Sequence, residues 1–126
     1  MALALGSKIA LFHVIEPVAT YVPVGASIDV ISGSPPELED DQTAVSVERL
    51  EKLAGPLRAR GLGVDCDVVV GMAVDEIVER ARTLGVRMIV LGSHGHGALF
   101  HLFSGSVVTG VLERSPAPVL VVPVRD

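Results

Sequence analysis

Three glycines and a serine in the C-terminal half have a spacing that suits anion binding. The stretch from Leu91 to Ser106 reads LGSHGHGALFHLFSGS, with two residues between Gly92 and Gly95 and nine between Gly95 and Gly105. Glycines let backbone N–H groups approach an oxyanion closely, because no Cβ stands in the way. A helix that begins beside Ser106 adds unpaired N–H donors and the positive end of a helix dipole. The stretch therefore predicts a cradle for phosphate.

The flanking sequence predicts the elements that hold this cradle in place. An apolar run, Val86–Leu91, predicts a buried strand before the glycines, and a helix is expected from about Ser104 to Arg114. Ligands of α/β proteins bind outside the carboxyl ends of parallel strands. The glycine stretch follows such a strand end, so it lies where a ligand is expected.

The rest of the chain alternates predicted strands with predicted helices. Strands are expected at 8–15, 64–70, 86–91 and 119–124, and a long irregular loop at 16–36, which holds four prolines. Helices are expected from about 36 to Gly61 and from about 74 to Gly85, with these apolar residues at helical spacing: Val47, Leu50, Leu53, Ala54, Leu57, Val74, Ile77, Val78 and Ala81. The alternation predicts one α/β domain, residues 1–126, with a parallel sheet and helices on both faces.

The amino-acid composition and net charge favour some classes of protein and argue against others. Hydrophobic residues make up 49% of the chain and aromatic residues 3%, which suits Val- and Ile-rich strands covered on both faces. The net charge of −5 argues against a generic binder of nucleic acid. No apolar run reaches the length of a membrane span, and the single cysteine forms no intrachain disulfide. We expect a cytoplasmic protein without a nucleic acid or membrane partner.

Other reactive residues do not suggest a catalytic or metal site. His94, His96 and His101 lie close in sequence, but no carboxylate or cysteine accompanies them, so no dedicated metal site is predicted. His13 is interpreted as a core histidine in an apolar strand. Cys66 is interpreted as a small buried or edge residue, since no base is paired with it in the sequence. No acid–base pair adjoins the glycine stretch, so no catalytic residue is assigned.

The complete glycine pattern resembles the G-2x-G-9x-G-(S/T) nucleotide motif of the universal stress protein family. The resemblance extends over nearly the whole chain and includes His13-Val14, Val70-Gly71, Asp75-Glu76-Ile77, Leu91–Gly95 and Pro118–Val122. It implies a Rossmann-like fold of the adenine nucleotide alpha hydrolase type. It also implies a stress-response or regulatory module that binds ATP.

The resemblance assigns a role to each matching position of this chain. Val14 and Leu91 would pack on the adenine, and Gly92 would lie near the ribose. The phosphates would be held by Gly95, His96, Gly105, Ser106 and Val107. No P-loop lysine is present, so backbone dipoles, His96 and a bound Mg²⁺ are expected to meet the phosphate charge.

The chain departs from the family pattern at its start. The family opens with a further strand that ends in an Asp and leads into a helix, whereas Met1–Leu5 resembles only the last turn of that helix. The missing strand would be the central one. We therefore expect an N-terminally incomplete domain, with a gap in the sheet between the strands at 8–15 and 86–91.

The expected oligomeric state is a homodimer, and little enzymatic activity is expected. The apolar strand Val119–Val124 is expected at a sheet edge, where an exposed strand invites pairing. The family resemblance implies a homodimer through this strand, with Pro123 limiting the ladder. ATP hydrolysis would be slow or partner-dependent, because no general base is evident. Two alternatives remain open: a nucleotide-independent dimeric interaction protein of the same fold, and an enzyme of a related nucleotide-binding fold.

Overall fold

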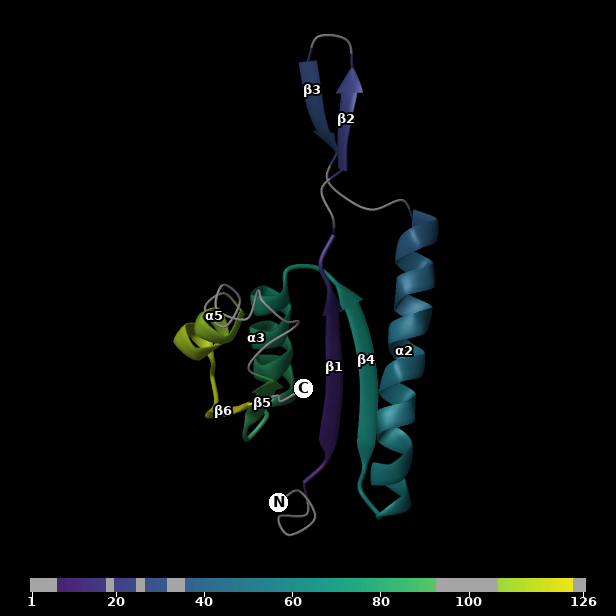
Figure 1. Ribbon diagram of the computed structural model, residues 1–126. Helices are drawn as coiled ribbons and strands as arrows, with labels where there is room; N and C mark the ends of the chain where they lie inside the picture. Colours follow the sequence, from purple (N-terminus) through teal and green to yellow (C-terminus); the bar gives the residue numbers. More distant parts are fainter. Residues whose placement is uncertain (1–6, 18–19, 25–26, 32–35, 93–106, 124–126) are drawn as a thin grey trace. The chain divides into compact units, whose positions relative to one another are not determined.

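A computed structural model describes residues 7–17, 20–24, 27–31, 36–92 and 107–123 (Figure 1). The element order along these residues is β1, β2, β3, α2, β4, α3, β5, α5 and β6. The chain divides into two compact units, residues 1–72 and residues 73–126. Strands alternate with helices in both units, apart from one hairpin in the first.

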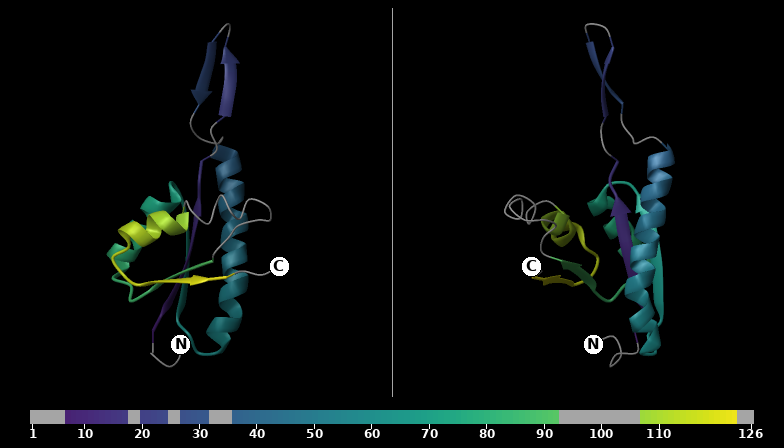
Figure 2. Two further views of the ribbon diagram at one scale, coloured as in Figure 1. Left: turned by 60° about the vertical axis from the view of Figure 1, so that its left-hand side comes forward. Right: turned by 45° about the vertical axis from the view of Figure 1, so that its right-hand side comes forward.

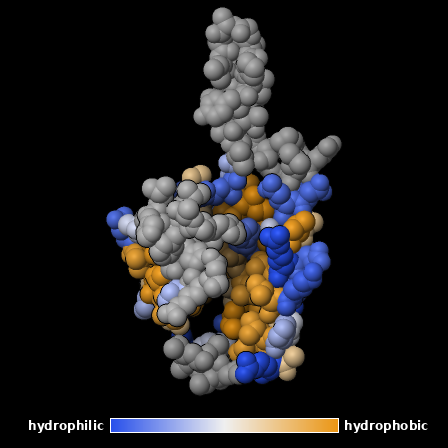
Figure 3. All heavy atoms as spheres, viewed as in Figure 1, coloured by the Kyte–Doolittle hydropathy of each residue, from blue (hydrophilic) through white to orange (hydrophobic). Residues whose placement is uncertain are grey.

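The first unit is built on a pair of parallel strands. β1 (Ile9–Ile15) and β4 (Val64–Val70) pair over their full lengths, from Ile9 opposite Val64 to Ile15 opposite Val70. Two further backbone hydrogen bonds extend the ladder, from Ile9 N to Gly63 O at 2.8 Å and from Gly71 N to Ile15 O at 3.0 Å. Figure 3 shows hydrophobic side chains gathered over β1 and β4. The parallel pairing of these strands was predicted and is confirmed.

The helix α2 (Pro36–Ala59) lies along this strand pair and packs mainly on β4 (Figures 1 and 2). Its less exposed positions recur at helical spacing: Thr43, Ser46, Leu50, Ala54 and Leu57. Val47 and Leu53 were predicted to belong to this stripe, but they are 40% and 61% exposed. The prediction was wrong because the less exposed face of α2 includes the small polar residues Thr43 and Ser46. The positions of the apolar residues alone therefore did not identify this face.

Residues 20–31 were predicted to be irregular, and that prediction was wrong. β2 (Thr20–Val24) and β3 (Ser27–Ile31) form an antiparallel hairpin, from Thr20 opposite Ile31 to Val24 opposite Ser27. Pro23 pairs with Ile28 within the ladder. Both strands of a two-stranded ribbon are edges, where a proline without an N–H is tolerated. The β-branched residues of the segment favour pairing, and this outweighs its prolines and glycines.

The second unit contains α3 (Ala73–Leu84), β5 (Ile89–Gly92), α5 (Val107–Arg114) and β6 (Val119–Val122). β5 and β6 are parallel, with Ile89 opposite Val119 and Gly92 opposite Val122. Ala81, Ile89 and Val111 form the buried core, and these partly buried residues pack around it: Val74, Ile77, Val86, Leu91, Val107 and Val119. The predicted inward face of α3 is confirmed.

Two glycines end helices as the sequence predicted. Gly61 and Gly85 have φ angles of 88° and 59°, which side chains disfavour. After Gly85, the Val86 N–H donates to Ala81 O at 3.2 Å, and Leu62 bonds to Leu57 O in the same way after Gly61. These are Schellman caps. Because Val86 belongs to a cap, β5 begins later than the apolar run suggested.

Four of the described strands form two parallel pairs, one in each unit. β1 pairs with β4 and β5 pairs with β6, and no described strand joins β1 to β5. The strands at 8–15 and 86–91 lie in different units, so the expected gap between them stays a prediction. None of the described helices is both long and apolar enough to span a membrane.

Candidate functional site

The elements on both sides of the glycine stretch are those that the sequence predicted. β5 ends at Gly92, and α5 begins at Val107. Four of the predicted site residues, Gly95, His96, Gly105 and Ser106, lie outside the described residues. So do His94 and His101. The structure thus describes the strand end and the helix start between which the predicted phosphate cradle lies.

Leu91 and Gly92 hold the strand side of this site. Leu91 is half-buried and packs against the core of the second unit, which fixes the end of β5. Gly92 pairs with Val122 at the last position of the β5–β6 ladder. Gly92 is therefore at the carboxyl edge of this parallel pair. This is the edge at which α/β proteins bind ligands.

Val107 holds the helix side. Its half-buried side chain packs against the same core, so the first turn of α5 is anchored to the sheet. The first N–H groups of an α-helix have no partner within the helix. The first turn of α5 contains no acidic residue, whereas the first turn of α3 contains Asp75 and Glu76. The positive end of α5 is therefore not compensated by a carboxylate of its own first turn, which suits an anion.

Val14 lies in the first unit and is half-buried on β1, opposite Val69 of β4. Leu91, its predicted partner in adenine binding, lies in the second unit. The adenine roles of both residues stay predictions. His13, beside Val14, is exposed, so its interpretation as a core histidine was wrong. In the part of the first unit that the structure describes, one helix, α2, packs on the β1–β4 pair, so the pair retains exposed residues, His13 among them.

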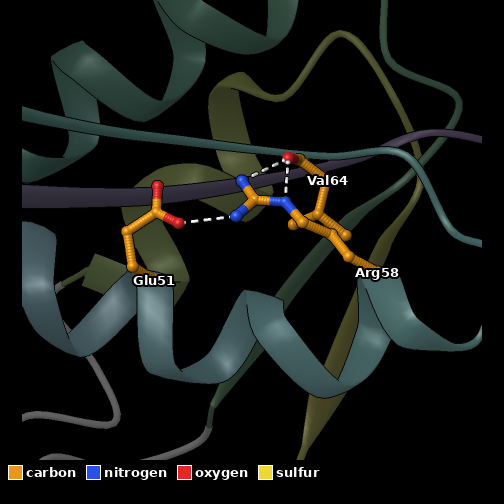
Figure 4. A network of polar contacts seen from close by, with 3 residues as sticks. All are labelled: Glu51, Arg58 and Val64. Atoms are coloured by element: carbon orange, nitrogen blue, oxygen red, sulfur yellow. Dashed lines mark hydrogen bonds and ion pairs between the residues drawn. The ribbon is translucent and has the colours of Figure 1, made fainter.

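The Arg58 guanidinium lies between α2 and β4, away from the glycine stretch in sequence. Its Nε and one terminal nitrogen donate to Val64 O at 3.1 and 2.7 Å, and the other terminal nitrogen lies 2.5 Å from a Glu51 carboxylate oxygen (Figure 4). This hydrogen bond lowers the pKa of Glu51 and raises that of Arg58. Arg58 thereby ties the end of α2 to the start of β4, which is a structural role.

Cys66 lies half-buried on β4, near this ion pair. Burial raises the pKa of its thiol, and the neighbouring Glu51 carboxylate adds to the effect. A raised pKa leaves little thiolate at neutral pH, so the thiol is a poor nucleophile. Among the residues that the structure describes, no three His, Cys, Asp or Glu side chains gather as metal ligands would.

Sequence reasoning did not single out two contacts of α5. Arg114 at its end pairs with Asp75 of α3, and Gly110 in its middle lies against Val74. The partners are far apart in sequence, so local patterns give no sign of either contact. Gly110 itself was the available signal. A glycine inside a helix lowers the stability of the helix, so its presence indicates a close contact at that position.

The chain is similar to known proteins of one family. The sequence profile of the universal stress protein family matches residues 1–123 of the chain. The chain belongs to the universal stress protein family. Membership of this stress-response family accounts for the alternating strands and helices and for the spacing of the glycines.

Individual family members support the assignment. Universal stress protein MJ0577 of Methanocaldococcus jannaschii is 37% identical over 86 residues, which cover 68% of this chain and 53% of that protein. Universal stress protein A homolog 2 of Coxiella burnetii is 31% identical over 121 residues, covering 94% of this chain and 76% of that protein. The chain thus spans about half the length of the first relative and more of the second.

Solved structures show the same fold. The structure of MJ0577 superposes with a TM-score of 0.72 at 27% identity, covering 95% of this chain and 78% of that one. A universal stress protein from Burkholderia pseudomallei gives a TM-score of 0.68 at 18% identity, which bears on the fold alone. The α/β, Rossmann-like class predicted from the sequence is confirmed.

Proposed function

We propose that this universal stress protein binds ATP and acts as a stress-response module. The observation that carries the proposal is the complete glycine spacing between a described strand end and a described helix start. Gly92 ends β5, and α5 begins with a first turn free of acidic residues. Backbone N–H groups and a helix dipole at this position suit a polyphosphate better than a neutral ligand.

The residues present fit such a ligand by their chemistry. Gly95, Gly105 and Val107 would offer backbone donors, Ser106 a hydroxyl, and His96 an imidazole. Since no lysine accompanies them, we propose that Mg²⁺ binds with the nucleotide and neutralises part of its charge. Cytoplasmic location and slow or partner-dependent hydrolysis belong to the same proposal, as does a single domain over residues 1–126.

Calorimetry with and without Mg²⁺ tests nucleotide binding. We expect ATP to release heat on binding the purified protein, and Gly105→Val with Ser106→Ala to abolish that heat while the circular dichroism spectrum is retained. Chromatography of denatured protein would reveal nucleotide carried through purification. Absence of both heat and carried nucleotide would overturn the proposal.

A nucleotide-independent interaction protein is the second candidate, and one observation favours it. Val90, Leu120 and Val122, on β5 and β6, are 56%, 43% and 41% exposed. Alternate residues of a strand share one face, so Leu120 and Val122 lie on the same face of β6. An apolar strand pair of this kind suits self-association. The homodimer through Val119–Val124 is a proposal common to both candidates.

A further inference from the structure

One face of α5 is fixed along its whole length within the second unit. Val107, Gly110, Val111 and Arg114 recur at intervals of three and four residues and so lie on one side of the helix. Val107 and Val111 pack in the core, while Gly110 and Arg114 contact α3. Figures 1 and 2 show α5 lying against α3. The direction of α5 is therefore set by Val107 in its first turn together with contacts made further along the helix.

Gly110 allows the closest of these contacts. A Cβ at this position would lie 2.8 Å from Val74 Cγ2 and 3.1 Å from Val74 Cγ1, which is too close. Val74 is β-branched and lies within a helix, so its side chain has little freedom to turn aside. Any residue larger than glycine would push α5 away from α3. This explains a glycine inside α5, where it otherwise costs helix stability.

Arg114 makes the second contact, at the far end of α5. Its guanidinium lies 2.5 Å from Asp75 Oδ1, at the start of α3. Seven residues separate Arg114 from Val107, which is about 10 Å along a helix. The Arg114 and Asp75 side chains are 52% and 62% exposed, so the ion pair is weaker than the contact at Gly110.

We propose that Gly110 and Arg114, with Val74 and Asp75 of α3, are positioning residues for the start of α5. They act through the direction of the helix, and so they set where its first N–H groups point. On the proposed function, which this inference rests on, they control phosphate affinity without touching the nucleotide. A rigid helix pinned at its middle and end carries any displacement there to its first turn.

The test compares matched substitutions in folded protein. Gly110→Ala inserts the clashing Cβ, and Gly55→Ala is its control, because a Cβ at Gly55 in α2 meets nothing within 4 Å. Arg114→Gln removes the ion pair to α3. Its control is Arg82→Gln, which breaks the Arg82–Glu79 pair within α3 and leaves α5 untouched. ATP dissociation constants are measured well below the unfolding temperature of each variant.

We expect Gly110→Ala to weaken ATP binding about 3-fold to 30-fold. Arg114→Gln should weaken it about 2-fold to 5-fold, since the pair is exposed. Neither control should change the constant. Adding Val74→Ala to Gly110→Ala makes room for the Cβ and should restore affinity, which loss of stability alone would not predict. Unchanged affinity in both Gly110→Ala and Arg114→Gln would overturn the inference.

A second readout does not need nucleotide. If Gly110→Ala does not fold, Arg114→Gln decides the question. If the parent protein does not bind ATP, the proposed function fails, and the backbone amide resonances of Val107 and Val108 decide the inference. Arg114→Gln should shift these resonances and Arg82→Gln should not. Resonances that stay in place would overturn the positioning role.

Discussion

At the scale of single residues, the Glu51–Arg58 pair has a pH dependence with a definite sign. Arg58 lowers the pKa of Glu51 below its ordinary value of 4.5. A carboxylate with a lowered pKa in the folded state stabilises the fold above its ordinary pKa, and this contribution is lost as the pH falls through the lowered pKa.

We therefore expect Glu51→Gln to lower the urea midpoint at pH 7 and to reduce the loss of stability between pH 5 and more acidic solution. Urea titrations at several pH values measure both effects. Glu48→Gln is the control, because Glu48 pairs with Lys52 on the exposed side of the same helix. An identical pH profile for Glu51→Gln and the parent protein would contradict the expectation.

Cys66 gives a second prediction at this scale. Its raised pKa and partial burial should make the native thiol react several-fold more slowly with a disulfide reagent at neutral pH than the thiol of urea-unfolded protein. The rate of absorbance change measures this directly. Glu51→Gln should raise the native rate, because it removes a carboxylate that disfavours the thiolate. A native thiol as reactive as the unfolded one would show the assignment to be wrong.

At the scale of elements, a glycine at a helix cap and a glycine inside a helix yield different predictions for the same substitution. Gly85→Ala forces a left-handed backbone on a residue with a Cβ and should destabilise the protein by about 1 kcal/mol. Gly55→Ala, inside α2, should change stability much less, because the helix propensity of alanine is offset by crowding of its Cβ against the following Pro56. Free energies of unfolding in urea measure both effects, and an equal loss of stability for the two substitutions would refute the cap assignment.

The elements themselves could largely be predicted from the sequence, because local physics determines them. Periodic apolar residues located α3, and Gly61 and Gly85 located helix ends. The errors came where a residue's effect depends on its partner. Val47 and Leu53 fit the helical period but are exposed. Pro23, one of the four prolines that suggested a loop, lies in a hairpin whose edge strands tolerate it.

At the scale of the whole molecule, the candidate site could be predicted only in part. The glycine spacing is a local pattern, so it indicated a strand end at Leu91 and a helix start near Ser104, close to the described ends at Gly92 and Val107. The contacts that hold α5 in place were not predictable in this way. Arg114 and Asp75 lie 39 positions apart in the sequence, and only packing brings such a pair together.

Self-association is the prediction that belongs to this scale. If the protein dimerises through Val119–Val124, Leu120→Glu should place a charge in the interface and halve the mass measured by light scattering. Leu53→Glu, at a 61% exposed position of α2, should leave the mass unchanged. A parent protein that is already monomeric, or a dimer that survives Leu120→Glu, would exclude this interface.

The β2–β3 hairpin has a consequence for how freely the chain can change its length. Thr20 and Ile31 face each other across the ladder, so the polypeptide leaves and returns within one strand spacing, about 5 Å. The twelve residues 20–31 therefore add almost nothing to the distance that the chain covers between β1 and α2. The hairpin can therefore be shortened, exchanged or replaced by another closed hairpin, because the distance between its two ends, which the remaining linkers must bridge, stays the same.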